Sequence, residues 1–465
     1  PDAARIGNLF WVGLSVFALY KAAKNMLGAD NSQALPFLML GAPAVMLTAH
    51  ETQPDLAIMA GYAVFFWGVS AFNGERFAPG ALLAALGLSI SLLAGGLLPV
   101  IPLAVALIGI LLFKPSLRLH ALTALILGLA LGGSWGLTVT TLATSAATLA
   151  PQSTSAALLQ ALWPVASIRA PHEIPGHLLA FIKLLAWASW PAWPIAAWTL
   201  WRRRLTFWHR ENLIPLAVLL VALAIQVLTS ATRPSKSLIL LVPIILLATA
   251  SVTHLRRGAA NLLDAFTLTL FSMTAAFIWL GWAAVQFGWP ESLAQTVTRL
   301  EPGFKATLTV TAPALAFLLT IGWFVLMRNI PRSPVRGIQH WFTGTTLIWA
   351  LVVALWSPWI DHGMSFTRMG QQIARQLDTG GCIATYQVND DARAALSYQL
   401  QREFPRTRIA ASRNCAYLLV ETPGHQPDLN LPRSWDSATK VWSGHRRGNR
   451  AERYTLYFRS TNPQP

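Results

Sequence analysis

The stretch Thr48-Ala-His-Glu-Thr-Gln-Pro-Asp-Leu56 is a short polar turn between two long apolar segments. It brings His50, Glu51 and Asp55 together beside apolar sequence, where a carboxylate is costly unless it is paired or hydrated. An ordinary solvated loop is the alternative, because any connection between membrane helices must be polar and Pro54 favours a turn. The character of the whole chain favours a functional turn.

Composition identifies the class of protein. Of the 465 residues, 54% are hydrophobic and only 12% are charged, whereas soluble domains carry about a quarter charged residues. Many of the 20 tryptophans lie near the ends of apolar runs, which is typical of aromatic belts at membrane interfaces. The net charge of +16 is dispersed over short loops and the C-terminal tail. We therefore expect an integral membrane protein whose basic residues meet anionic lipid and not nucleic acid.

The apolar runs predict an α-helical polytopic membrane protein with about twelve transmembrane helices and a small C-terminal α/β domain. A spanning helix needs about 20 apolar residues, and each run is close to that length. The runs are 7–27, 34–49, 55–72, 78–95, 97–113, 119–142, 178–201, 213–230, 237–253, 262–285, 306–327 and 341–358.

Basic residues alternate between the loops and predict the orientation. Among the loops that join the apolar runs, one set holds most of the lysines and arginines, and we assign it to the cytoplasmic side. The opposite, exoplasmic set contains the turn at 50–55, the connection 143–177, the turn 229–237, the loop 286–304 and the tail. The basic set is Lys21, Lys24, Arg76, Lys114, Arg118, Arg202, Arg203, Arg204, Arg210, Arg256, Arg257, Arg328, Arg332 and Arg336.

The sequence changes character near residue 361, which predicts a membrane domain over 1–360 and an exoplasmic α/β domain over 361–465. Strands are expected at 382–388, 416–420, 439–442 and 453–458, a helix at 390–404, and a basic hairpin loop at 444–448. The two cysteines, Cys382 and Cys415, both fall in this tail. We expect a disulfide between them in an exoplasmic compartment, with two buried free thiols as the alternative.

Common hydrolase and nucleotide-binding motifs are absent from the sequence: it has no Walker loop, GxSxG elbow, paired CxxC or HExxH. The segment His172-Glu-Ile-Pro-Gly-His177 resembles HExxH, but the second histidine is one position late, and we expect Pro175 and Gly176 to break the helix that would align the ligands. A polar loop with two interfacial histidines is one interpretation. A site for a divalent metal or for substrate at His172 and His177 is the other.

A basic turn precedes the run that begins at Leu238. In Thr229-Ser-Ala-Thr-Arg-Pro-Ser-Lys-Ser237, Arg233 and Lys236 lie where a lipid phosphate would be at the exoplasmic interface. Both side chains can bind phosphate directly. The alternative is that they only extend from a helix end towards water.

Three features together resemble a known family. They are the acidic turn Gln53-Pro-Asp55-Leu, the Thr-Arg-Pro-Ser-Lys turn leading into Leu238-Ile-Leu-Leu-Val-Pro243, and the α/β tail. This pattern is similar to the GT-C glycosyltransferases of family 39 type, the branch with the lipid A aminoarabinose transferases and protein O-mannosyltransferases. Those enzymes move a sugar from a polyprenyl-phosphate carrier to an exoplasmic acceptor. The resemblance implies a transferase in a bacterial inner membrane, acting on a lipid A-like or other acceptor in the periplasm.

The resemblance also implies roles for individual residues. Asp55, with Glu51 and His50 beside it, matches the acidic second exoplasmic loop, and Lys236 and Arg233 match the residues that hold the carrier phosphate. The family's first helix and its large first loop, which bears the principal catalytic carboxylates, would lie before Pro1. Positive charge stabilises a leaving phosphate, and a carboxylate serves as base for the acceptor. Alternatives are a transporter or flippase for lipid-linked sugars and an O-antigen ligase or polymerase type of membrane protein.

Overall fold

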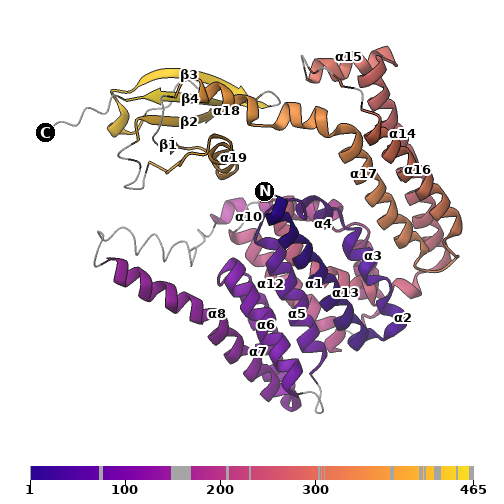
Figure 1. Cartoon of the computed structure of the whole chain (residues 1–465). Helices are drawn as coiled ribbons and strands as arrows, with labels where there is room; N and C mark the ends of the chain where they lie inside the picture. Colours follow the sequence, from indigo (N-terminus) through magenta and orange to yellow (C-terminus); the bar gives the residue numbers. More distant parts are fainter. Residues whose placement is uncertain are drawn as a thin grey trace. The chain divides into compact units, whose positions relative to one another are not determined.

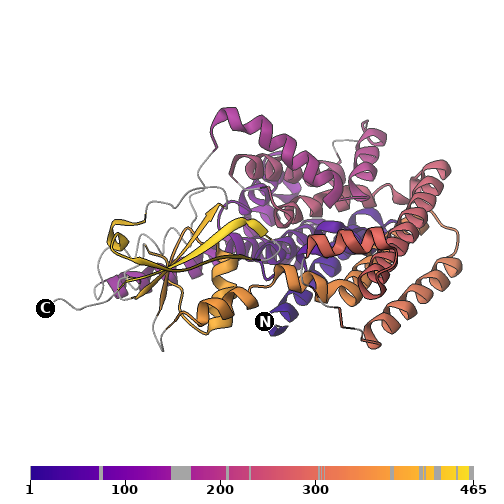
Figure 2. The same cartoon turned by 90° about the horizontal axis from the view of Figure 1, so that it is seen from above.

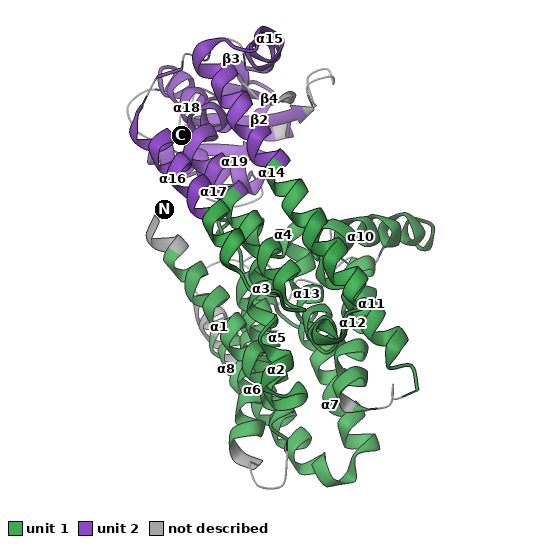
Figure 3. Cartoon of the chain, turned by 90° about the vertical axis from the view of Figure 1, so that its right-hand side faces the viewer, with its two compact units in different colours: residues 1–272, 323–347 green, residues 273–322, 348–465 purple. Residues whose placement is uncertain are grey.

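The computed structural model describes most of the chain and divides it into two compact units (Figure 3). The helical unit comprises residues 1–272 and 323–347, and the sheet-containing unit comprises 273–322 and 348–465. The predicted boundary near residue 360 remains a prediction. The described residues are 2–72, 77–147, 169–205, 209–229, 232–301, 304, 306–307, 309–377, 382–407, 412, 415–423, 431–446 and 449–459.

Helices account for nearly all of the helical unit (Figure 1). Three of them, α14, α16 and α17, also supply residues to the sheet-containing unit. The helices are α1 (Asp2–Leu27), α2 (Ala29–Ser32), α3 (Leu35–Leu40), α4 (Pro43–Thr48), α5 (Asp55–Ser70), α6 (Phe77–Gly95), α7 (Val100–Phe113), α8 (Arg118–Ala147), α10 (Ile174–Ala188), α11 (Ala192–Arg202), α12 (Arg210–Thr229), α13 (Pro234–Thr249), α14 (Arg257–Phe287), α16 (Thr311–Asn329) and α17 (Arg336–Met364), with short 3₁₀ turns η1 (Pro115–Leu117), η2 (Pro171–Glu173) and η3 (Val252–His254).

The multi-span membrane class is confirmed by helix length and composition. Among the described residues, 6 helices are long and apolar enough to cross a membrane, and a bent pair, α10 with α11, makes up to 7. Shorter apolar helices are α5, α7, α13 and the part of α6 from Pro79. The predicted count of twelve spans is not confirmed.

Two predicted spans are interrupted. The run 178–201 forms α10 and α11, which meet at an angle of 103°, because Pro191 lacks a backbone N–H and disfavours helical geometry in the residue before it. The run 34–49 forms α3 and α4, each of 6 residues, separated at Gly41 and Ala42 ahead of Pro43. A single straight span was therefore the wrong expectation for both runs.

The core of the helical unit is built around α5 and α13. Every residue of α13 from Ser237 to Thr249 is buried, as are all of α5 except Ala57, Trp67 and Ser70. A helix that is apolar on all sides belongs in a protein interior or a membrane. Both helices have 16 residues, a length of about 24 Å that is shorter than the roughly 30 Å hydrocarbon core. At least one end of each helix is therefore recessed relative to a membrane surface.

Glycines let α5 and α6 approach each other closely. A Cβ added to Gly87 of α6 would lie 2.4 Å from the backbone nitrogen of Phe65, and one added to Gly68 of α5 would lie 2.2 Å from that of Ala84. Small residues at such positions allow the van der Waals contact that holds membrane helices together. The glycine contacts therefore set the position of α5 against α6.

The sheet-containing unit carries the predicted α/β fold. Its four-stranded sheet has the order β1-β2-β4-β3 (Figure 1). Figure 2 shows the same strands, in yellow, from above. The pair β1–β2 is parallel and connected through α19, whereas β4 is antiparallel to both β2 and β3. The elements are α15 (Glu291–Leu300), α18 (Thr367–Ala374), β1 (Ile383–Tyr386), α19 (Asp390–Leu400), β2 (Tyr417–Pro423), the 3₁₀ turn η5 (Arg433–Trp435), β3 (Thr439–Arg446) and β4 (Asn449–Phe458).

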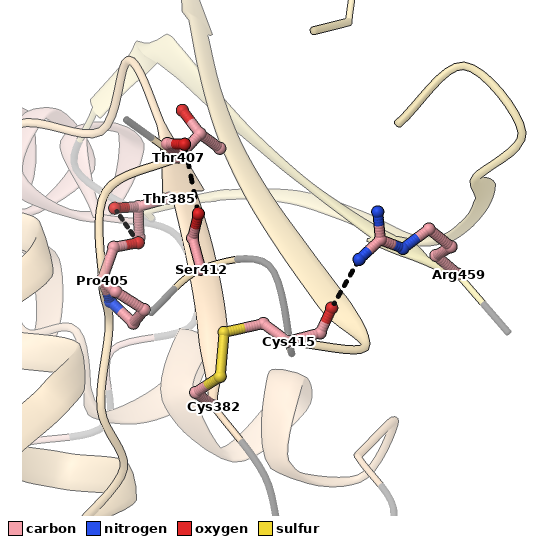
Figure 4. Close-up of a disulfide and its surroundings, with 7 residues drawn as sticks. All are labelled: Cys382, Thr385, Pro405, Thr407, Ser412, Cys415 and Arg459. Atoms are coloured by element: carbon pink, nitrogen blue, oxygen red, sulfur yellow. Dashed lines mark hydrogen bonds between the residues drawn. A yellow bond between two sulfur atoms is a disulfide. The ribbon is translucent and has the colours of Figure 1, made fainter. Parts of the chain in front are cut away.

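The predicted strands and helix of the tail are present, with one correction. The basic hairpin loop expected at 444–448 is shorter, because β3 continues to Arg446, which pairs with Asn449; residues 447 and 448 lie outside the described residues. Cys382 and Cys415 are joined by a disulfide across 33 positions of sequence (Figure 4).

Candidate functional site

Asp55 and Lys236 form an ion pair between the two central helices. Asp55 is the first residue of α5, and Lys236 lies in the first turn of α13. Lys236 Nζ lies 2.8 Å from Asp55 Oδ1, and the exposed fractions of the two side chains are 33% and 4% respectively. The structure therefore brings together two sequence-predicted residues that are 181 positions apart.

Helix dipoles explain how each charge is accommodated. The positive end of the α5 macrodipole favours the Asp55 carboxylate. The same end of α13 disfavours Lys236, and the first turn of α13 contains no acidic residue. Asp55 supplies the missing negative charge, so the lysine is held by a partner on another helix.

The pair opens into a cavity of about 180 Å³. Its polar lining includes Asp55, Lys236, Tyr62, Gln226 and Thr229. The Tyr62 hydroxyl donates to the Pro99 carbonyl over 2.7 Å. Gln226 is only 6% exposed, and its Oε1 has no hydrogen-bond partner among the described residues. A buried amide oxygen of this kind is normally satisfied, so Gln226 Oε1 is an exception in the wall of this cavity.

Hydrogen bonds hold the turn between α4 and α5 against α1. The side chain of Asn8 is buried and donates to the carbonyls of Ala49 and Glu51, at 3.0 and 2.9 Å. His50 and Glu51 are both exposed, and the Glu51 carboxylate accepts a hydrogen bond from Gln53. Neither residue is part of the described cavity lining. Of the three predicted catalytic residues, only Asp55 lines the cavity.

Arg233 occupies a different position from Lys236. It is the N-cap residue of α13, in extended backbone conformation, and its side chain is exposed. Arg233 is absent from the described cavity lining. A role in holding a phosphate at the cavity entrance remains a prediction for this residue.

The two predicted metal ligands lie at the start of α10. His172 belongs to η2 and its side chain is 81% exposed, with Nε2 4.0 Å from Glu173 Oε1. His177 lies in the first turn of α10. Pro175 is the second residue of this helix and does not break it as expected, because proline is compatible with the first helical turn, where no N–H is needed. Within the described ranges, no group of three or more His, Cys, Asp or Glu side chains could hold a metal. The metal site remains an untested prediction.

Contacts also define the opposite end of the helical unit. Asn25, next to Lys24 near the end of α1, donates to Ser70 at the end of α5. Arg203, just after α11, donates to the carbonyl of Ala250, which follows α13. Lys24 and Arg203 therefore lie near the ends of α5 and α13 that are remote from Asp55 and Lys236, and the predicted orientation in the membrane remains a prediction.

Sequence reasoning missed three polar residues that shape the site: Asn8, Tyr62 and Gln226. Gln226 carried a usable signal, because it interrupts the apolar run 213–228 and polar residues inside spans are usually functional. Asn8 and Tyr62 carried little signal, since their partners are carbonyl groups more than 35 positions away in sequence.

The fold and this site define a multi-pass helical membrane protein with an ion pair between two central helices and a small sheet in its C-terminal part. No protein-family model matches the sequence, and no curated protein matches it. Two solved structures share the fold, both of ArnT from Cupriavidus metallidurans. The structure bound to undecaprenyl phosphate has 13% sequence identity and a TM-score of 0.63, covering 99% of this chain and 85% of that one. The apo structure has 14% identity and a TM-score of 0.59, covering 97% and 83%. The chain therefore has the ArnT-like GT-C fold.

Proposed function

We propose that this protein is a membrane glycosyltransferase that moves a sugar from a polyprenyl-phosphate carrier to a lipid A-like or other acceptor. The observation that carries the proposal is the Asp55–Lys236 pair at the cavity, in a chain with the fold of ArnT. One of the two ArnT structures is bound to undecaprenyl phosphate. A polyprenyl phosphate is an anion on a lipid tail, which suits a cation beside a cavity in an apolar helical unit.

The proposed chemistry assigns a separate task to each charge. In transfer, the bond between the sugar and the carrier phosphate breaks, the acceptor oxygen bonds to the sugar carbon, and the acceptor proton goes to a base. Lys236 stabilises the departing phosphate, since an ammonium has three donors and one of them is directed at Asp55. Asp55 orients the lysine and is the proposed base, while His50 and Glu51 are proposed to act on the acceptor side of the same turn.

We also propose the location of this chemistry. Arg203, and Lys24 beside Asn25, lie near the ends of α13 and α5 away from Lys236 and Asp55, which favours a cytoplasmic assignment for that end. The disulfide in the C-terminal tail suits an oxidising compartment. The proposal places the protein in a bacterial inner membrane, with the Asp55 cavity and the C-terminal tail in the periplasm.

Substitution of the ion pair tests the function. Lys236→Ala removes a charge-assisted contact worth about 1.5–3 kcal/mol, so affinity for undecaprenyl phosphate should fall by about ten- to a hundredfold. Asp55→Asn keeps the shape and leaves the lysine free for phosphate, so binding should persist while sugar transfer falls. The measurements are carrier affinity by titration and transfer to a lipid acceptor in membranes.

The controls separate this proposal from its alternatives. Lys236→Arg retains the charge and should retain most of the binding, and Lys24→Ala removes an exposed lysine at the other end and should change neither quantity. Unchanged affinity and transfer in both Lys236→Ala and Asp55→Asn would refute the site. Carrier movement across vesicles without any sugar transfer would favour a flippase.

A further inference from the structure

Two adjoining cavities lie at the end of the helical unit remote from Asp55 and Lys236. The first is an apolar groove of about 460 Å³ between α11 and the start of α14, with Trp190, Ile195, Leu262 and Phe266 in its walls. The second is a basic cavity, also of about 460 Å³, lined by Trp198, Trp201, Arg202, Arg204, His254 and Arg256. Trp198 and Arg256 line both, so the two cavities adjoin at these side chains.

The basic cavity concentrates positive charge. Every titratable side chain in its described lining is basic. The guanidinium of Arg256 lies 5.6 Å from the centre of the Trp198 ring, and that of Arg204 lies 5.1 Å from the Trp201 ring. Stacking on a ring face leaves the N–H groups at the edge of a guanidinium able to bind an anion. The neighbouring acid, Glu211, is instead 3.5 Å from Arg203.

Local electrostatics support an anion site. The pKa of His254 is lowered, first by partial burial and then by the charges of Arg202 and Arg203. The charges of Arg202 and Arg203 are the secondary cause of this shift, and they give a positive potential around His254. Nothing in the described lining of the basic cavity offsets this potential with a carboxylate.

The two cavities together fit one kind of occupant. A phosphate alone would leave the apolar groove unfilled, and an apolar chain alone would leave the three arginines without an anion. Trp198 and Trp201 are residues of the type that lies at headgroup level, and basic pockets between membrane helices bind the headgroups of anionic lipids. We propose that an anionic phospholipid binds here, with its phosphate in the basic cavity and one acyl chain in the groove.

This site is separate from the proposed carrier site. Lys236 lies in the first turn of α13, whereas His254 follows the end of the same helix, so the two sites lie at opposite ends of α13. The lipid contacts α11 and α14 across the bend between α10 and α11. It therefore stabilises the position of α11 and does not take part in the transfer reaction.

The test is lipid binding to the full-length protein in detergent, measured by native mass spectrometry. Phosphatidylglycerol should bind about tenfold tighter than phosphatidylcholine, because each arginine near an anionic headgroup favours binding. The double variant Arg204→Gln/Arg256→Gln should abolish that preference. Ala259→Phe, which places a ring in the groove, should weaken both lipids while leaving the arginines intact.

The same lipid-binding measurement provides the control and the outcomes that would contradict the proposal. Lys114→Gln changes an exposed cation outside both cavities and should leave the preference unchanged. Equal affinity for the two lipids in the unmodified protein, or an equal loss with Lys114→Gln, would overturn the proposal. Full competition by water-soluble glycerol phosphate would show a free-phosphate site, and tighter binding of undecaprenyl phosphate than of phosphatidylglycerol would show a second carrier site. Each of these results excludes the phospholipid.

Discussion

At the scale of single residues, the proposed site is built from polar groups that lie in the wall of one cavity among apolar helices. Lys236 lies at the unfavourable end of the α13 dipole and is tolerated because Asp55 lies 2.8 Å away. Gln226 buries an oxygen with no described partner. A buried unsatisfied acceptor costs about 1–3 kcal/mol, so the residue lowers the stability of the empty protein.

Gln226→Leu tests whether the buried amide, which lowers stability, contributes to sugar transfer. Removing the amide, whose Oε1 has no described partner, should leave the free energy of unfolding unchanged or raise it by about 1 kcal/mol. If the amide binds a substrate group in the cavity, sugar transfer should fall by about two- to tenfold, the effect of one neutral hydrogen bond. Thermal denaturation and a transfer assay give the two values. Lower stability with normal transfer would show that Gln226 is only a packing residue, and Gln226→Asn should recover part of the activity.

At the scale of elements, the position of Asp55 depends on how α5 packs against α6. The contacts at Gly68 and Gly87 are backbone to backbone, and a side chain at either position must push the helices apart. Because Asp55 begins α5 and Lys236 belongs to a different helix, a shift of α5 changes the distance between their charges.

Gly87→Val tests this dependence. The new side chain would meet the backbone of Phe65 and Gly61, so we expect a loss of at least about 1–3 kcal/mol in stability from overpacking. Carrier binding should weaken as well, because the ion pair is displaced. Gly133→Val in α8 is the matched control, since nothing lies within 4 Å of a Cβ at that position, and its effect should be small. Similar midpoints for the two variants would argue against close α5–α6 packing.

At the scale of the whole molecule, the sheet is stabilised by its own core and by a covalent link. Side chains of α18 and α19 pack with Ile383, Leu419 and Leu456 on one face, whereas Leu418 and Trp435 lie in a cluster on the other. The disulfide ties the start of β1 to the residues just before β2, and Arg459 donates to the carbonyl of Cys415 (Figure 4).

Cys382→Ser should destabilise the C-terminal tail without preventing membrane insertion. The disulfide closes a loop of 33 positions, and loss of such a bond costs about 2–5 kcal/mol, largely by freeing the unfolded chain. Limited proteolysis of membrane vesicles should cleave the variant tail faster than the oxidised protein, while the membrane fraction stays constant. Equal protease resistance before and after reduction of the unmodified protein would contradict the prediction.

The sequence by itself determined the class of protein, the approximate helices and strands, and two residues of the cavity, Asp55 and Lys236. These features are local. Apolar runs partition out of water, and an alternation of apolar and polar residues favours a strand, independently of distant parts of the chain. Tertiary structure alone decided that Asp55 pairs with Lys236 and that His50, Glu51 and Arg233 lie outside the described cavity lining. It also decided the bend of α10 against α11 and the placement of an apolar groove beside a basic cavity. Such results depend on which helix faces meet, and that is set by close packing between segments far apart in sequence.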